Sequence, residues 1–282
     1  MSEAKAVDTA RTICFVSDRT GVTAETIGHS LLSLFGGRAF HTVTMPFVLN
    51  PGQATGVVAR INALGAEQKS KPIVFCTVVD KDTRATIKQA NALVLDLFST
   101  FVGQLEAELG AEAGVAGVPA MHGAKTDPTY AARIDATNYA LANDDGAGAR
   151  DYRSANVVLI GVSRSGKTPT CLYLALQYGV FAANCPLTED ELEAGELPKA
   201  LVPHKQKLYG LILKPERLQQ IRSERRPGSR YASAQQVQYE LRAAQALFDR
   251  LGVPHLDVTE CSIEEIASRI MDQMGLARHA RS

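Results

Sequence analysis

The chain has 282 residues, of which 45% are hydrophobic and 21% are charged, proportions that are typical of a folded globular protein and exclude a disordered chain or a long coiled coil. Lysine and arginine together number 30, as do aspartate and glutamate, so the formal net charge is zero and no overall positive field attracts nucleic acid or an anionic membrane. At a prior of about 150 residues per domain, the length predicts two domains.

The sequence shows no targeting or membrane-spanning pattern. Its start, MSEAKAVDTARTICFVSD, has no apolar stretch of signal-peptide length. Nowhere do about 18 apolar residues follow one another, as a spanning helix needs. We therefore expect a cytoplasmic protein that binds neither a membrane nor nucleic acid.

The cysteines predict packing rather than chemistry. They form no C-x-x-C pair, and most lie in apolar runs, where a thiol behaves as a small hydrophobe. No pair of histidines or cysteines has the spacing of a zinc site, so no structural zinc is expected. The five cysteines are Cys14, Cys76, Cys171, Cys185 and Cys261.

The first part of the chain alternates short apolar runs with longer helical patterns. This βαβαβα order predicts a parallel sheet covered by helices, and we assign residues 1–110 to an N-terminal α/β domain. Strands are predicted over 12–17, 41–48 and 71–79, and helices over 23–35, 52–65 and 83–109.

A second alternating series follows a segment rich in glycine and alanine. Residues 111–150 are interpreted as a linker with a connecting helix over 130–145. Residues 151–282 then form a P-loop kinase-like α/β domain, which completes the predicted fold class of two α/β domains. Its strands are predicted over 156–161, 180–187, 207–213 and 254–259, and its helices over 216–224, over 234–250, from Pro169 and from Ile263.

The stretch GVSRSGKT, residues 161–168, matches G-x-x-x-x-G-K-[ST] at every position and lies between a predicted strand and a predicted helix. In that order the loop N–H groups and the helix N-terminus face one anion. Lys167, expected on the surface of the loop, would reach the outer phosphoryl oxygens as a catalytic residue, and the Thr168 hydroxyl would hold Mg²⁺. The predicted nucleotide-binding residues are Gly161, Val162, Ser163, Arg164, Ser165, Gly166, Lys167 and Thr168.

Two features depart from an ordinary phosphate loop. Pro169 lacks an N–H donor in the part of the cradle nearest the inner phosphates, which predicts a different phosphate register from that of an ATPase. No run of four apolar residues ends in aspartate at the usual place of the metal-orienting carboxylate, and the near matches are Asp257 and Asp80. The metal geometry therefore stays open.

Four arginines lie within nine residues, around Pro227-Gly228. Guanidinium groups that close over a phosphoryl donor neutralise charge on the transferred group, so the segment is a candidate catalytic lid. A solvated helix end is the alternative. Arg226 and Arg230 flank the expected hinge and are the catalytic candidates, and Arg225 belongs to the same cluster. Arg222 is expected to belong to the preceding helix and to face solvent.

Asp257 is the first candidate for the general base that would deprotonate a threonine hydroxyl. It ends a predicted strand, and ligands of open α/β sheets bind beyond the carboxyl ends of the strands. The same stretch also reads as a helix start, in which Thr259 or Ser262 caps the final helix with Glu265 in the first turn.

The loop SDRTGVTAET of the first domain also joins a strand to a helix. Ser17, Asp18, Thr20 and Thr23 would bind phosphate or a target loop, or would cap the helix. His29 and His41 are interpreted as packing or surface residues.

Five stretches along the chain are recognisable together: FVSDRTGVTAETIGHSLL, ARIDATNYALANDDG, VVLIGVSRSGKTPTCLYLALQYGVFAANCPL, YGLILKPERLQQIRSERRPGSRYAS and DVTECSIEEIASRIMDQMGL. In them the chain closely resembles the bacterial phosphoenolpyruvate synthase regulatory proteins, which are relatives of the regulator of pyruvate, phosphate dikinase. The resemblance covers residues 12–276.

The resemblance implies a bifunctional regulator. Such proteins use ADP, not ATP, to phosphorylate a threonine of the synthase, which inactivates it. They restore activity when inorganic phosphate attacks the phosphothreonine and releases pyrophosphate. Carried onto this chain, the resemblance implies ADP binding at residues 161–168 and the synthase as protein partner, and we expect Mg²⁺ and a homo-oligomer.

Two residues bear on the choice within this family. Dikinase regulators generally read SRTSKTP where this chain reads SRSGKTP, so Gly166 favours the synthase as target. The family usually reads SDGTG or SDGTA where this chain has Arg19 in place of the glycine. If that position needs a positive φ, the N-terminal loop is altered.

Three functions therefore compete. The first is the protein kinase and phosphorylase, acting on the synthase or on the dikinase. The second is a small-molecule kinase, because a phosphate loop followed by an arginine-rich lid also suits nucleoside monophosphate kinases. The third is a nucleotide-gated binding module without chemistry.

Overall fold

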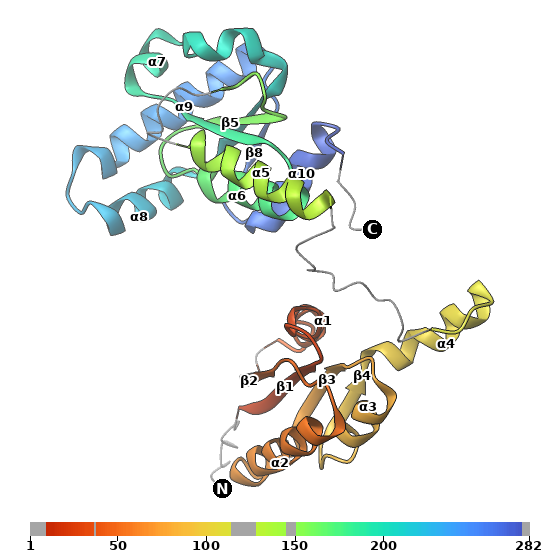
Figure 1. The fold of residues 1–282 in the computed structure, drawn as a ribbon. Helices are drawn as coiled ribbons and strands as arrows, with labels where there is room; N and C mark the ends of the chain where they lie inside the picture. The colour runs from red at the N-terminus through yellow and green to blue at the C-terminus, as the bar shows by residue number, and fades with distance from the viewer. Residues whose placement is uncertain (1–9, 37, 114–127, 145–150, 278–282) are drawn as a thin grey trace, which may run out of the picture. The chain divides into compact units, whose positions relative to one another are not determined.

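The computed structural model describes residues 10–36, 38–113, 128–144 and 151–277. The chain divides into two compact units, Met1–Pro119 and Ala120–Ser282, each built on a four-stranded parallel sheet (Figure 1). This confirms the predicted α/β fold class. No helix in the described ranges is long and apolar enough to cross a bilayer.

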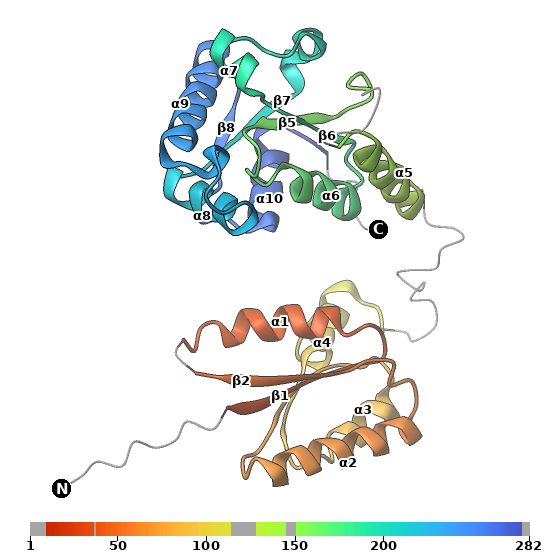
Figure 2. The ribbon, with the colours of Figure 1, turned by 90° about the vertical axis from the view of Figure 1, so that its left-hand side faces the viewer.

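The first unit is a parallel sheet with helices on both faces (Figure 2). Helices α2 and α3 pack on one face with Cys14, Ile61 and Cys76, and α1 and α4 lie on the other with Phe15 and Phe75. The strand order is β2-β1-β3-β4. The strands are β1 (Arg11–Ser17), β2 (Phe40–Met45), β3 (Ile73–Thr77) and β4 (Leu93–Asp96), and the helices are α1 (Val22–Leu32), α2 (Pro51–Glu67), α3 (Lys81–Ile87) and α4 (Leu97–Leu109).

The single helix predicted over 83–109 is wrong, because strand β4 interrupts it. The short apolar run before Asp96 pairs with β3, where Val94 lies opposite Val74. Asp96 then ends the strand and caps α4 by accepting a 3.0 Å hydrogen bond from the Ser99 N–H. Apolar spacing alone does not separate so short a strand from a helix.

The second unit repeats the same sheet order, β6-β5-β7-β8, again with all strands parallel. Its strands are β5 (Val157–Gly161), β6 (Ala182–Pro186), β7 (Leu208–Ile212) and β8 (His255–Asp257). Its helices are α5 (Pro128–Ala142), α6 (Lys167–Tyr178), α7 (Glu189–Ala194), α8 (Pro215–Arg225), α9 (Ala234–Leu251) and α10 (Ile263–Gln273), with 3-10 helices η1 (Lys199–Lys207) and η2 (Arg230–Ala232). The strands and long helices predicted for this part are all present.

Helix α5 belongs to the second unit rather than to a free connection. Its Ala136 and Ala140 are buried in the same core as β5 and α6, and it packs along α6 and β6. Small alanines let the two helices approach closely, and the composition of the segment, poor in large apolar residues, hides this contact from a hydrophobicity pattern.

Strand β5 lies at the point where the chain order reverses, because the next two strands add on its opposite sides. Open parallel sheets bind ligands at the carboxyl end of the strands at such a point. The loop that leaves β5 is the predicted phosphate loop.

Candidate functional site

The loop from β5 to α6 is shaped by its two motif glycines. A Cβ atom at Gly161 would lie 2.5 Å from the carbonyl oxygen of Leu211 on β7, so a side chain has no room where the loop leaves the sheet. Gly166 has a φ of 89° and is the N-cap of α6, a conformation that favours glycine. The turn therefore presents the N-terminus of α6 at the sheet edge, where it can bind an anion.

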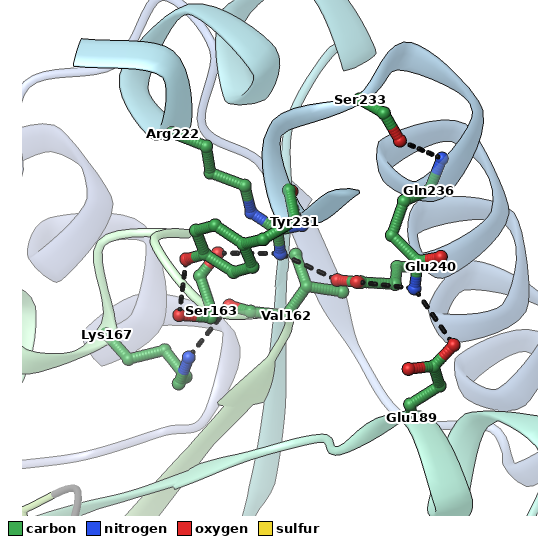
Figure 3. Close-up of polar contacts among 9 residues, drawn as sticks. All are labelled: Val162, Ser163, Lys167, Glu189, Arg222, Tyr231, Ser233, Gln236 and Glu240. Carbon is green, nitrogen blue, oxygen red and sulfur yellow. Dashed lines mark hydrogen bonds and ion pairs between the residues drawn. The ribbon is translucent and has the colours of Figure 1, made fainter. Parts of the chain in front are cut away.

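Lys167 is the first residue of α6 and only 3% exposed. Its Nζ donates a 2.9 Å hydrogen bond to the carbonyl oxygen of Val162 (Figure 3). The expectation that Lys167 lies on the loop surface is wrong, because the aliphatic stem packs inside and the ammonium group returns to the loop backbone. Its charge is thus held where an anion bound by the loop N–H groups would meet it.

The hydroxyl of Ser165 is an independent sign of a phosphate site. Ser165 is 1% exposed, and its Oγ has no hydrogen-bond partner among the described residues. A buried polar atom without a partner is costly and calls for an explanation. A phosphate oxygen held in the loop would supply the partner, so the residues present fit a phosphate group.

Thr168 contacts two side chains that no sequence pattern singled out. Its hydroxyl donates a 2.7 Å hydrogen bond to Oδ1 of Asp144, which follows α5, and accepts one of 3.1 Å from Nδ2 of Asn184 on β6. Asn184 also donates to Asp144. Oxygen ligands of these kinds suit Mg²⁺, so the site fits the metal predicted at Thr168. Asp144 lies in the stretch ARIDATNYALANDDG, but no spacing rule linked it to the loop.

The two near matches for a metal-orienting carboxylate serve other contacts. Asp80 lies in the first unit, where it caps α3 by accepting a 2.8 Å hydrogen bond from the Thr83 N–H. A hydrogen bond from the Thr83 hydroxyl, and then this backbone bond, lower the pKa of Asp80. Asp257 ends β8, which lies two strands from β5, or roughly 10 Å at the usual strand spacing.

The segment after β8 forms the predicted start of a helix. The carboxylate of Asp257 accepts hydrogen bonds from the N–H of Thr259, at 2.9 Å, and from its hydroxyl. Ser262, not Thr259, caps α10 in a capping box with Glu265, whose pKa these bonds lower. The role of Asp257 as general base stays a prediction.

Arg222 lies in α8 as predicted, but it is fully buried, so the expectation that it faces solvent is wrong. Its guanidinium group donates to the carbonyl oxygens of Ser163 at 3.1 Å and Tyr231 at 3.0 Å, and pairs with Glu240 at 2.6 Å (Figure 3). It also lies over the Tyr231 ring, 4.1 Å from the centroid. The Tyr231 hydroxyl donates to Ser163 Oγ at 2.8 Å. Arg222 and Tyr231 therefore tie the arginine-rich segment to the phosphate loop.

The two arginines proposed for the lid are exposed. Arg226 follows the last residue of α8, and Gly228 has a φ of 69°. Arg230 forms an ion pair with Glu189 in the first turn of α7. Exposed pairs of this kind contribute little to stability, so Arg230 can exchange its partner for a phosphate group. The lid itself stays a prediction.

In the first unit, the loop after β1 is held by its own polar residues. Ser17 Oγ accepts a 3.1 Å hydrogen bond from the Arg19 N–H, and Asp18 accepts one of 3.0 Å from the Val79 N–H. The N-cap of α1 is Gly21, with a φ of 88° and no side-chain cap. Arg19 does not have a positive φ, so its replacement of glycine imposes no backbone strain.

The other candidate residues of the first unit are surface residues, and the cysteines are mostly buried. Thr20, Thr23, His29 and His41 are exposed, and His29 packs its ring against Phe15 at 5.1 Å between centroids. Four of the five cysteines are buried. Burial raises the pKa of both Cys14 and Cys76 to about 11, so these thiols stay protonated and unreactive.

The comparison with known proteins decides the family. The family model described as Kinase/pyrophosphorylase matches residues 13–271, which include both sheets and the phosphate loop. The chain belongs to the kinase/pyrophosphorylase family. Its membership supports a phosphotransferase activity.

Relatives of this chain match over nearly their whole length. A protein of Alcanivorax borkumensis is 51% identical over 95% of this chain and 98% of its own. One of Halorhodospira halophila is 50% identical, and one of Legionella pneumophila (strain Corby) is 47% identical, each over 95% of this chain and 98% of its own. All three are named "Putative phosphoenolpyruvate synthase regulatory protein".

Proposed function

We propose that this chain regulates phosphoenolpyruvate synthase by reversible phosphorylation of a threonine on that enzyme. ADP donates the phosphoryl group in the inactivating reaction, and inorganic phosphate removes it in the activating reaction. The observation that carries the proposal is the complete phosphate loop, with a buried Lys167 and a Ser165 hydroxyl that has no partner among the described residues. The names of the relatives supply the target.

The two reactions balance as phosphoryl transfers. In the first, the threonine oxygen attacks the β-phosphorus of ADP, loses its proton, and AMP leaves. In the second, a phosphate oxygen attacks the phosphothreonine phosphorus, the bond from that phosphorus to the threonine oxygen breaks, pyrophosphate is released, and the threonine oxygen takes up a proton. Asp257 is the proposed group that accepts and returns the proton.

The loop residues supply charge and position. Lys167 neutralises the outer phosphoryl oxygens, and the N–H groups of residues 161–168 hold the rest of the diphosphate. Mg²⁺, which Thr168 is proposed to hold, would add positive charge at the phosphates when bound. Because Pro169 has no N–H group to offer the phosphates, ADP binds with its β-phosphate where other phosphate loops place a γ-phosphate.

The synthase is the proposed target rather than the dikinase, because Gly166 stands where dikinase regulators generally carry serine. Its φ of 89° is a conformation that strains a serine. The backbone of this phosphate loop therefore favours glycine at position 166, the residue that synthase regulators carry there.

The test follows a labelled phosphoryl group. The purified chain is incubated with ADP labelled at the β-phosphate, AMP and phosphoenolpyruvate synthase, and we expect the label on a synthase threonine. A synthase with valine at that threonine is the matched control. Label that moves from ADP into another soluble nucleotide, such as ATP, would instead indicate a small-molecule kinase, label in added dikinase the other target, and no transfer a binding module.

The donor preference is tested in the same assay. We expect highly purified ATP, labelled at the γ-phosphate, to leave the synthase unlabelled at concentrations where ADP gives full labelling. Equal turnover of the two nucleotides would show that the phosphate register argued from Pro169 is wrong.

We predict that replacing Arg226 or Arg230 with alanine lowers the rate of threonine phosphorylation by at least about tenfold, or about 1.4 kcal/mol of transition-state stabilisation. ADP binding should change little, because groups that close over the donor act mainly on the transition state. Single-turnover labelling beside an equilibrium ADP titration separates the two effects.

Arg242 provides the control for the lid arginines. It is exposed on α9 and donates to Gln238 one turn away, so Arg242→Ala removes the same charge outside the segment. Unchanged phosphorylation rates in both Arg226→Ala and Arg230→Ala would contradict the lid and support the alternative, a solvated helix end.

A further inference from the structure

Strands β7 and β8, which follow β5 on one side of the sheet, do not supply a carboxylate to the phosphate loop. In many nucleotide-binding proteins an aspartate at a strand end helps the loop serine or threonine to hold the metal. Strand β7, next to β5, leads into Leu213 and Lys214. Strand β8 ends in Asp257, whose carboxylate is bound by Thr259. The contact that an aspartate makes with Thr168 comes instead from the other side of β5.

That contact is made by Asp144, one residue beyond the turn that ends α5. Its Oδ1 lies 2.7 Å from the Thr168 hydroxyl oxygen, although the two residues are 24 positions apart. Among the described residues, no lysine or arginine forms a salt bridge with it. The C-terminal end of α5 adds the negative end of a helix dipole beside this carboxylate.

The position of Asp144 is fixed by its neighbours. The carbonyl oxygen of Asn143 accepts a 3.3 Å hydrogen bond from the N–H of Asn184 on β6, and the Asn143 side chain accepts one of 2.7 Å from the Asp151 N–H. Asn143 is itself buried. The end of α5 is therefore anchored to the strand beside β5, which holds the carboxylate at the loop.

Asn184 provides an independent observation. It is 1% exposed, and its Nδ2 donates to both Asp144 and Thr168. The Oδ1 of the same amide group is buried and has no hydrogen-bond partner among the described residues. A water of a hydrated divalent cation would donate to it, since Mg²⁺ keeps several waters when it binds beside phosphates.

We propose that Asp144 and Thr168 together anchor the divalent cation that accompanies the nucleotide, with Asn184 orienting both side chains. The inference rests on the proposed nucleotide binding at residues 161–168. Among the described residues, no group of three or more histidine, cysteine, aspartate or glutamate residues can hold a metal. In this proposal phosphate oxygens and water supply the remaining ligands, so the cation binds tightly only together with ADP.

The test measures how Mg²⁺ changes ADP affinity, without any target protein. In the native full-length chain we expect Mg²⁺ to lower the Kd for ADP at least about tenfold, which is about 1.4 kcal/mol of coupling. In Asp144→Asn the effect of Mg²⁺ should fall below about twofold. The metal-free Kd should stay equal or improve, because a carboxylate that repels the diphosphate is lost.

Two further variants and a second readout sharpen the result. Thr168→Val, which removes the hydroxyl at nearly constant shape, should lose the same coupling. Asp135 is an exposed aspartate on α5, the helix that precedes Asp144, and Asp135→Asn should keep the coupling. Electron paramagnetic resonance of Mn²⁺ should show ADP-dependent binding to the native chain and to Asp135→Asn, and none to Asp144→Asn.

The outcomes separate this inference from the proposed function. If ADP binds and Asp144→Asn keeps the full effect of Mg²⁺, the cation is held elsewhere and the inference is overturned while the proposed function stands. If the native chain binds no ADP with or without Mg²⁺, the proposed function is overturned and this inference falls with it.

Discussion

Lys167→Met should abolish both phosphoryl transfers, lowering each by at least about 10²–10³-fold. The substitution keeps the length of the buried stem and removes the ammonium group, which is held in the loop by its hydrogen bond to the Val162 carbonyl. Charge at the outer phosphoryl oxygens is needed whichever way the group moves, so one substitution should stop the two reactions together. Single-turnover labelling of the synthase and release of pyrophosphate measure them separately.

A matched lysine controls for the lost hydrogen bond. Lys207 also donates from Nζ to a backbone carbonyl, that of Arg153, at 2.7 Å. It directly precedes β7, so it lies at the amino end of the parallel strands, whereas the phosphate loop lies at their carboxyl end. Lys207→Met removes this exposed hydrogen bond, should cost at most about 1 kcal/mol of stability, and should keep both activities. If Lys167→Met kept either activity near its native rate, the two reactions would not share the phosphate loop as a single site.

The sequence predicted best what depends on neighbours along the chain. The phosphate loop is one contiguous motif between a strand and a helix, and the structure places Gly161 and Gly166 at the backbone positions that need glycine. The same holds for the capping box of α10, where Ser262 and Glu265 lie three residues apart. Such features are local, so a residue pattern carries them.

What the sequence did not predict depends on contacts between distant segments. Asp144 reaches Thr168 only because α5 packs along α6, and that packing uses small alanines that a hydrophobicity pattern overlooks. Arg222 was expected in solvent because arginine is rarely fully buried, and its partner Glu240 lies 18 residues away on α9. Strand β4 was missed because its three apolar residues, Leu93, Val94 and Leu95, fit a helix as well as a strand.

The burial of Arg222 predicts that Arg222→Met destabilises the second unit by about 3–5 kcal/mol, because breaking a buried ion pair leaves the remaining charge without its partner. The charge left behind is Glu240, whose side chain is only 12% exposed and keeps the 3.0 Å hydrogen bond from Gln236. For a unit of this size the midpoint of thermal unfolding should fall by about 6–20 °C. Calorimetry of the full-length chain measures it.

Two comparisons separate the ion pair from other effects of the substitution. Arg225→Met removes an exposed arginine three residues further along α8 and should change stability by less than about 0.5 kcal/mol. The double variant Arg222→Met with Glu240→Leu should be more stable than Arg222→Met alone, because replacing both partners of a buried pair by apolar groups is often neutral. A loss below about 1 kcal/mol in Arg222→Met would mean that the pair contributes no more than a surface one. The link from α8 through Ser163 to the phosphate loop would then be too weak to hold the arginine-rich segment at the site.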